Sequence, residues 1–141
     1  MTLYLDTSLL VAALTNEPDT PRVQKWFRQV ERQDITISDL VVTEMSSSLS
    51  IKVRTGQIGL AVRAAALASF TRLITDTFSL LPIERALFQI AANYADQVEL
   101  CLRAGDSLHL AVCAEYGLTL CTLDKRLAEA APAVGVPVIV P

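Results

Sequence analysis

Short apolar runs alternate along the chain with longer segments in which apolar residues recur every three or four positions. The short runs have the length of β-strands and the longer segments have the period of helices. We predict strands at residues 3–5, 35–37, 78–81, 118–122 and 136–140. We predict helices at residues 8–14, 39–52, 60–75, 84–98, 105–115 and 125–131, with another that follows residue 20. Continuously apolar strands separated by helices are typical of a parallel sheet that is buried on both faces.

The pattern therefore predicts one α/β domain over residues 1–141. A three-layer α/β/α arrangement with a central, mainly parallel sheet of four to five short strands is expected. Local signals mark several helix ends. Thr20 is expected to cap the second helix with Pro21 in its first position, and Ser38 to cap the third. Gly117 is expected to end the helix that Gly105 opens.

The apolar content is high for a small domain, with 52% hydrophobic residues and a mean hydropathy of +0.41. No apolar run approaches the roughly 20 residues that span a bilayer; the nearest, residues 60–70, contains Arg63. We therefore expect the excess to cover a partner surface, formed by regions such as 23–30 and 60–70, and expect no membrane association. The first residues lack a basic stretch and include Asp6, so no signal peptide is expected.

The cysteines and the net charge set further limits. Cys101, Cys113 and Cys121 lack the spacing of a zinc site, and we expect all three to be buried, reduced residues of a cytoplasmic protein. The net charge of −3 and the pI of about 5.1 argue against an ordinary basic nucleic-acid binder. That argument weakens if clustered acids are neutralised by a metal.

Four acids follow predicted strands or lie in predicted helices close to the sheet. Asp6 and Asp124 follow two of the predicted strands, Asp106 lies in the first turn of a helix, and Glu44 lies in the helix after the second strand. Taken singly, each is explained as a cap or a surface acid. Buried together, they repel one another and pay a desolvation cost, which a divalent cation would offset. Oxygen-only ligands favour Mg²⁺ or Mn²⁺.

These residues carry a family resemblance that runs from residue 3 to residue 140. The chain resembles PIN-domain ribonucleases, and in particular the VapC toxins of toxin–antitoxin pairs. The segments that carry the resemblance are LYLDTSLLVAAL, SDLVVTEMSSSLSIKVRTGQI and LRAGDSLHLAVCAEYGLTLCTLD. It implies a single PIN domain with Mg²⁺-dependent endoribonuclease activity, a cognate antitoxin partner, an RNA substrate and a homodimer.

The resemblance also implies roles for individual residues. Asp6 and Asp106 would be the core metal ligands, and Glu44 and Asp124 would complete the acidic pocket directly or through water. The cation would activate a water molecule for attack on a phosphodiester, so that no side-chain nucleophile is needed. Three hydroxyl residues are candidates for orienting the carboxylates, with local capping as the alternative: Thr7, Ser8 and Thr122.

Other residues near these motifs have weaker assignments. His109 shares a helix face with Asp106, and we favour packing at the edge of the core over a role as general base. Trp26 and Phe27 are expected to pack against the core or a partner and not to stack on bases. The basic residues nearest the acidic motifs are candidates for RNA phosphate contacts: Lys52, Arg54, Arg103, Lys125 and Arg126. Arg126, two residues after Asp124, is the first choice.

Other functions differ in how well they agree with these residues. A PIN-fold nuclease that acts in RNA processing or on DNA without a toxin role, and a non-catalytic PIN-fold interaction module, stay open as alternatives. A phosphoryl-aspartate phosphatase would need a second Asp at position 8, which is Ser8. A receiver domain would need paired acids beside the first strand, where this chain has Asp6 and Thr7. Both are disfavoured.

Overall fold

A computed structural model describes residues 1–30 and 34–141, and within these residues five short strands form one sheet. The strands are β1 (Leu3–Leu5), β2 (Ile35–Ser38), β3 (Ser79–Leu81), β4 (Thr119–Cys121) and β5 (Val138–Ile139). Their order across the sheet is β3-β2-β1-β4-β5, and every neighbouring pair is parallel. The predicted sheet is confirmed, and β1 lies at its centre.

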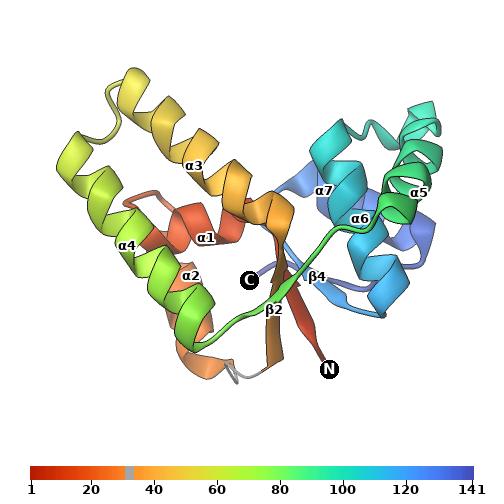
Figure 1. The fold of residues 1–141 in the computed structure, drawn as a ribbon, viewed down its shortest axis with the longest axis horizontal. Helices are drawn as coiled ribbons and strands as arrows, with labels where there is room; N and C mark the ends of the chain where they lie inside the picture. Colours follow the sequence, from red (N-terminus) through yellow and green to blue (C-terminus); the bar gives the residue numbers. More distant parts are fainter. Residues whose placement is uncertain (31–33) are drawn as a thin grey trace.

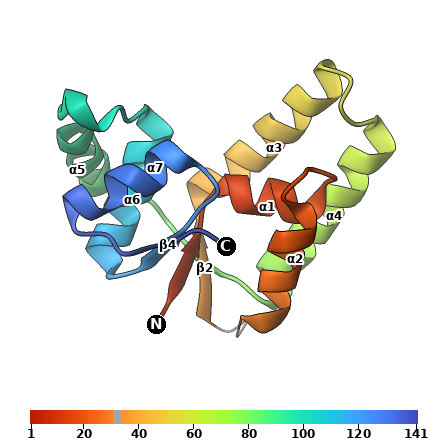
Figure 2. The same cartoon turned by 180° about the vertical axis from the view of Figure 1, so that it is seen from behind.

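The helices lie on both sides of the strands, as Figures 1 and 2 show from opposite directions. On one side are α1 (Thr7–Leu14), α2 (Thr20–Gln29), α3 (Asp39–Arg54) and α4 (Leu60–Asp76). On the other are α5 (Arg85–Ala95), α6 (Ala104–Tyr116) and α7 (Lys125–Ala130). Short 3₁₀ turns, η2 (Val98–Leu100) and η3 (Ala131–Val134), complete the elements. The three-layer α/β/α prediction is confirmed.

Burial of the central strands explains why their sequences are continuously apolar. All residues of β1, β2 and β4 are buried, and the core on both sides of the sheet is apolar. In the parallel register Leu3 pairs with Ile35 on one side and with Thr119 on the other. The carboxyl ends of three adjacent strands therefore lie at one edge of the sheet, where Asp6, Ser38 and Thr122 follow or end β1, β2 and β4.

Two predicted helix caps differ in the structure. Helix α2 begins at Thr20 with Asp19 as its N-cap, and the Thr20 hydroxyl donates instead to the carbonyl of Ala12 at 2.6 Å. Ser38 holds the N-cap position of α3 but makes no capping hydrogen bond with its side chain. Its hydroxyl lies 2.7 Å from the hydroxyl of Tyr4, because the end of β2 turns this side chain toward β1.

The prediction of three buried cysteines is wrong for one of them. Cys113 and Cys121 are buried, but Cys101 is exposed. Helix α5 ends at Ala95, earlier than predicted, and η2 follows it to a surface turn in which Cys101 has a φ of 54°. The Cys101 side chain is therefore exposed at this turn, where it lines an open hollow beside α7.

The two helical regions predicted to leave apolar surface are exposed only in part. In α4, Phe70 is buried whereas Leu60 is 73% exposed and Val62 is also exposed. In α2, Trp26 and Phe27 are half-buried against the core and form an edge-to-face pair with ring centroids 5.2 Å apart. Their packing role is confirmed. Across residues 1–30 and 34–141, no helix combines the length and hydrophobicity needed to cross a membrane.

Candidate active site

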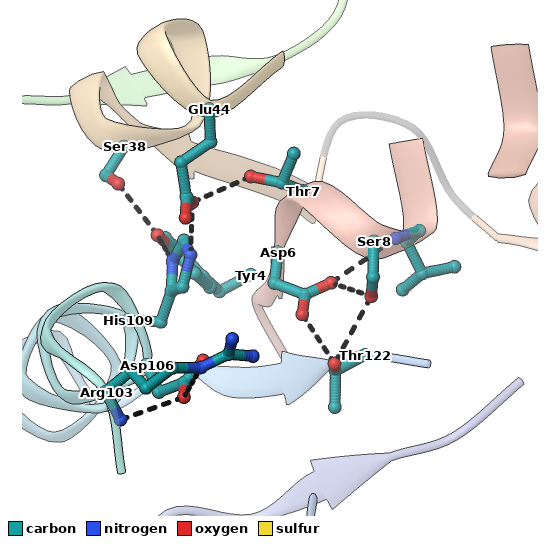
Figure 3. A network of polar contacts seen from close by, with 11 residues as sticks. Tyr4, Asp6, Thr7, Ser8, Ser38, Glu44, Arg103, Asp106, His109 and Thr122 are labelled. Carbon is teal, nitrogen blue, oxygen red and sulfur yellow. Dashed lines mark hydrogen bonds and ion pairs between the residues drawn. The ribbon is translucent and has the colours of Figure 1, made fainter. Parts of the chain in front are cut away.

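Asp6 lies at the junction of β1 and α1 and is only 4% exposed. Its Oδ1 accepts hydrogen bonds from the Ser8 hydroxyl at 2.6 Å and from the backbone N–H of Leu9 at 3.3 Å. Its Oδ2 accepts from the Thr122 hydroxyl at 2.5 Å. Figure 3 shows Ser8 and Thr122 next to each other, each in contact with this carboxylate. The carboxylate is therefore fixed in place by residues from both β1–α1 and the end of β4.

Burial dominates the protonation of Asp6. Desolvation raises its pKa above the ordinary value of 3.8, and the positive charge of His109 and the hydrogen bonds from Ser8, Thr122 and Leu9 lower it by less. An ionised Asp6 is thus disfavoured by its own surroundings. Carboxylates whose pKa is perturbed by burial are common at functional sites, where a bound cation would offset the cost.

Glu44 projects from α3 toward the same edge of the sheet. Its Oε1 accepts hydrogen bonds from the Thr7 hydroxyl at 2.8 Å and from His109 Nε2 at 2.6 Å. Burial is the largest single influence on Glu44 and raises its pKa, but the hydrogen bond and charge of His109 together with the Thr7 hydrogen bond lower the pKa overall. Glu44 is thus ionised more readily than an ordinary glutamate.

His109 is neither a simple core histidine nor free to act as a base. It is 3% exposed, and its Nδ1 lies 2.7 Å from the Tyr4 hydroxyl while Nε2 contacts Glu44. Both ring nitrogens are therefore engaged within the protein. The predicted position near the core edge is correct, but the sequence reasoning missed the contact with Glu44.

Asp106 lies in the first turn of α6, as predicted. Its Oδ2 accepts the backbone N–H of Arg103 at 3.1 Å, and the Arg103 Nε lies 3.8 Å from the same oxygen. Asp106 is partly buried, whereas the side chain of Arg103 is largely exposed. Figure 3 shows Asp6, Glu44 and Asp106 projecting from three different elements into the same part of the molecule.

Asp124 lies at the end of β4 and also caps α7. Its Oδ1 accepts from the backbone N–H groups of Arg126 at 3.0 Å and Leu127 at 3.2 Å. It is connected to Asp6 through Thr122, whose hydroxyl oxygen accepts the Asp124 backbone N–H at 2.9 Å. Thr122 thus links Asp124 to Asp6, while the side chain of Asp124 itself caps the N-terminus of α7.

An open hollow of about 490 Å³ lies beside these residues. Thr7, Ser8 and Asp124 line it together with Lys52, which is mostly buried and forms a 2.7 Å ion pair with Glu17. The predicted phosphate contact Arg126 is exposed and lines a separate hollow. Lys52 thus shares a hollow with Asp124, an acid of the site, and Arg103 contacts another acid, Asp106.

The donor set of the site matches the chemistry of a divalent cation. Within residues 1–30 and 34–141, no three His, Cys, Asp or Glu side chains are already gathered as metal ligands. Glu44 Oε2, Asp106 Oδ1 and Asp124 Oδ2 accept no hydrogen bond from the part of the chain that the structure describes. Unused carboxylate oxygens are suitable ligands for Mg²⁺ or Mn²⁺.

Comparison with known families shows which family has this sequence pattern. The family model described as the PIN domain matches residues 3–132. The chain belongs to the PIN domain family. The PIN domain resemblance predicted from the acidic motifs is therefore confirmed.

Relatives of this PIN domain include proteins named VapC. Ribonuclease VapC47 of Mycobacterium tuberculosis is 28% identical over 138 residues, covering 94% of this chain and 92% of that protein. The crystal structure of Mycobacterium tuberculosis VapC20, described as a sarcin–ricin loop cleaving toxin, has a TM-score of 0.76 at 17% identity, covering 99% of this chain and 100% of that one. A toxin–antitoxin complex from Klebsiella pneumoniae has a TM-score of 0.64 at 18% identity, covering 99% and 97%. The structural similarity shows a shared fold.

Three residues of the site in this PIN domain were not identified from the sequence. Tyr4 and Ser38 continue the hydrogen bonds behind His109, and Gly105 lies beside Glu44. One signal was available for Tyr4, which lies two residues before Asp6 in a strand and thus on the same face. No pattern in the sequence indicates that Gly105 approaches a residue 61 positions earlier.

Proposed function

We propose that this PIN domain is a Mg²⁺- or Mn²⁺-dependent endoribonuclease and the toxin of a VapBC-type pair. The observation that carries the proposal is Asp6, a buried carboxylate whose surroundings disfavour its charge, fixed beside two further acids with unused oxygens. Such a carboxylate destabilises the fold at neutral pH, so its presence is explained by a function that needs the charge. The names of the VapC relatives support ribonuclease activity as that function.

In this proposal the acids hold the cation and the hydroxyl residues hold the acids. A bound divalent cation lowers the pKa of a coordinated water and neutralises charge on the phosphate oxygens. Asp6 and Asp106 are the proposed core ligands, and Glu44 and Asp124 complete the set directly or through water. Ser8 and Thr122 keep both oxygens of Asp6 in fixed positions. Hydroxyl groups that fix a ligand carboxylate in this way maintain the ligand geometry.

Lys52 is the basic residue that we propose to contact the RNA backbone in the hollow beside Asp124. Its ammonium group lies at 2.7 Å from Glu17, and both side chains line this hollow. A phosphate oxygen arriving there would compete with Glu17 for the ammonium group. Arg126, which lines another hollow, is retained as a second contact farther along the strand.

Cleavage of total RNA tests the proposed activity directly. Purified protein should cleave RNA in the presence of Mg²⁺ or Mn²⁺, lose activity with a chelator and regain it when the cation is restored. Asp6→Asn and Asp106→Asn should each remove the activity, whereas Asp76→Asn, at an exposed acid at the end of α4, should retain it. Cleavage that persists in both site variants would contradict the assignment.

Matched substrates separate the alternatives. Single-stranded DNA of the same sequence should stay intact, and mapping of the RNA product ends should show discrete internal sites. Cleavage of the DNA would favour a DNA nuclease. Failure to bind Mg²⁺ or Mn²⁺ in calorimetry, at protein concentrations adequate for millimolar affinity, would favour a non-catalytic interaction module.

Two apolar surfaces support our proposal that this protein, as a toxin of the cytoplasm, binds protein partners. An apolar groove of about 240 Å³ lies between α1, α2 and α4, with Leu14, Phe27 and Leu73 among its lining residues. We propose that a cognate antitoxin occupies this groove. A separate shallow hollow on α5 and α6 includes Phe88, which is 54% exposed. We propose that this surface contributes to a homodimer.

Light scattering and co-expression test these partners. The protein alone should be dimeric, and Phe88→Ser should weaken the dimer without affecting the groove. If a small reading frame adjoins this gene, co-expression with its product should give a soluble complex that lacks ribonuclease activity. A stable monomer at high concentration would contradict the proposed dimer.

A further inference from the structure

A chain of buried hydrogen bonds lies behind Glu44. The hydroxyls of Ser38 and Tyr4 are 2.7 Å apart, and the Tyr4 hydroxyl is 2.7 Å from His109 Nδ1. His109 Nε2 in turn is 2.6 Å from Glu44 Oε1. Figure 3 shows these four side chains in succession. Tyr4 and Ser38 are fully buried and His109 nearly so, so water does not compete for these contacts.

The chemistry of the partners fixes the direction of the contact with Glu44. An ionised carboxylate only accepts, so Nε2 of His109 carries a proton and donates a hydrogen bond to Glu44 whether the ring is neutral or charged. Nδ1 accepts from the Tyr4 hydroxyl when the ring is neutral and donates to the Tyr4 oxygen when the ring is protonated. Burial raises the pKa of Tyr4 well above its ordinary value, which keeps this hydroxyl protonated as a donor. His109 thus donates to Glu44 in either protonation state, with Tyr4 in contact with its other nitrogen.

Glu44 is held through one oxygen only. Thr7 and His109 both donate to Oε1, at 2.8 and 2.6 Å. Oε2 accepts from no donor among residues 1–30 and 34–141, and it faces the backbone of α6 at Gly105. A Cβ atom placed on Gly105 would lie 3.0 Å from Oε2, closer than nearly all such contacts.

Gly105 is otherwise unexpected at its position. It lies in the first turn of α6 at a φ that other residues adopt, and alanine is the more favourable residue in a helix. Its lack of a side chain is explained by the close approach of Glu44 Oε2. Oε1 of Glu44 is therefore fixed by two hydrogen bonds, whereas Oε2 has space beside Gly105.

We infer that His109 is a positioning residue that, with Tyr4 behind it and Gly105 opposite, holds Glu44 through Oε1 and leaves Oε2 free beside Gly105. A general-base role does not fit, because both ring nitrogens are engaged and the ring is buried. The inference rests on the proposed function in one respect, namely that Glu44 takes part in holding a cation. The orientation of Glu44 itself does not depend on that proposal.

Nuclear magnetic resonance of the metal-free protein tests the orientation without any activity. His109 is the single histidine of the chain, so its ring ¹⁵N signals need no assignment. Long-range ¹H–¹⁵N spectra should show a proton on Nε2, and Tyr4→Phe should shift the Nδ1 signal by removing its hydrogen-bond partner. A ring with no proton on Nε2 would overturn the inference. This result stands even if the protein cleaves no RNA.

Metal binding of His109 variants tests the consequence. His109→Leu removes the donor and should weaken Mn²⁺ affinity in calorimetry by about 10–100-fold. His109→Gln offers an amide N–H near the position of Nε2 and should restore most of the affinity. Equal affinity in the wild type and in His109→Leu would overturn the role. If His109→Leu fails to fold, Tyr4→Phe takes its place, with a smaller loss expected and with no loss overturning the role.

The spacing at Gly105 is tested with a matched glycine. Gly105→Ala should leave the melting temperature unchanged or higher, because alanine favours the helix, while it displaces Oε2 and weakens Mn²⁺ affinity. Gly59→Ala is the control, since a Cβ there meets no atom within 4 Å. Wild-type Mn²⁺ affinity in a folded Gly105→Ala protein would overturn the spacing role. If the wild type itself binds no Mn²⁺, the proposed function fails while the ring ¹⁵N result still decides the orientation of Glu44.

Discussion

The Thr122 hydroxyl donates a hydrogen bond to Asp6 Oδ2 at 2.5 Å, although the two residues are 116 positions apart in the chain. They meet because β1 and β4 are parallel neighbours and end at the same edge of the sheet. The same hydroxyl oxygen accepts the backbone N–H of Asp124 at 2.9 Å. Thr122 thus connects the acid that follows β1 with the acid that follows β4.

Replacing Thr122 with valine should damage the site more than the fold. Valine preserves the shape but removes the donor to Asp6 and the acceptor for the Asp124 N–H. Loss of partners by buried polar groups costs about 1–3 kcal/mol of unfolding free energy. Removing an orienting residue should lower RNA cleavage by about 10–100-fold.

Urea unfolding and single-turnover cleavage measure these two effects, with Thr122→Ser as the control that retains the hydroxyl. Wild-type cleavage by a folded Thr122→Val protein would show that Thr122 does not orient Asp6.

Asp6→Asn should stabilise the protein at neutral pH and abolish its activity. Burial raises the pKa of Asp6 in the folded state above 3.8, so the ionised carboxylate opposes folding once the pH exceeds the folded-state value. Asparagine has no charge to desolvate and still offers an oxygen to Ser8 and an N–H to the hydroxyl oxygen of Thr122. A gain of about 1 kcal/mol in unfolding free energy is expected.

The pH dependence identifies the cause of that gain. The advantage of Asp6→Asn should shrink as the pH falls through the folded-state pKa of Asp6, because the wild-type carboxyl then becomes neutral. Urea unfolding between pH 7 and pH 4, without divalent cations, measures the difference. An advantage that is constant with pH would show that desolvation of the Asp6 charge is not responsible.

We expect Asp124 to have two roles that mutations can separate. One is to cap α7, and the other is to contribute negative charge to the proposed cation site. Its Oδ1 accepts two backbone N–H groups at the start of α7, and asparagine caps helices about as well as aspartate. Asp124→Asn should therefore retain stability, whereas Asp124→Ala should lose about 1 kcal/mol.

If Asp124 also contributes charge to the cation site, both variants should lose RNA cleavage. Thermal unfolding and cleavage rates measured on the same preparations distinguish the roles. Full cleavage by Asp124→Asn would restrict Asp124 to helix capping.

One thiol should react in the native protein and two more only after unfolding. Cys101 is exposed, whereas burial raises the pKa of Cys121 to about 12 and raises the pKa of Cys113 well above its ordinary value. Titration with a thiol reagent at pH 8 measures the count, and Cys101→Ser should remove the fast reaction. Fast reaction at two sites in Cys101→Ser would contradict the burial of the other pair.

The order of strands and helices followed from the sequence because it depends on local periodicity. The apolar runs at β1 and β4 are continuous since both faces of these strands are covered. The carboxylates at the ends of these strands were recognisable for the same reason, because an acid after a buried run stands out. The acidic motifs alone sufficed to predict the PIN fold, with Asp6, Glu44, Asp106 and Asp124 as candidates.

The partners of these carboxylates were decided by the tertiary structure. His109 looked like a packing residue because nothing near it in sequence shows that Glu44, 65 positions away, receives its Nε2 proton. Cys101 looked buried because hydropathy does not reveal that the turn after η2 faces solvent. The sequence by itself determined that two acids follow strands, Asp6 and Asp124, and that two lie in helices, Glu44 and Asp106. Only the packing of β1, β4, α3 and α6 decided that both oxygens of Asp6 are anchored and that one oxygen of Glu44 is left free, because those contacts join residues far apart in the chain.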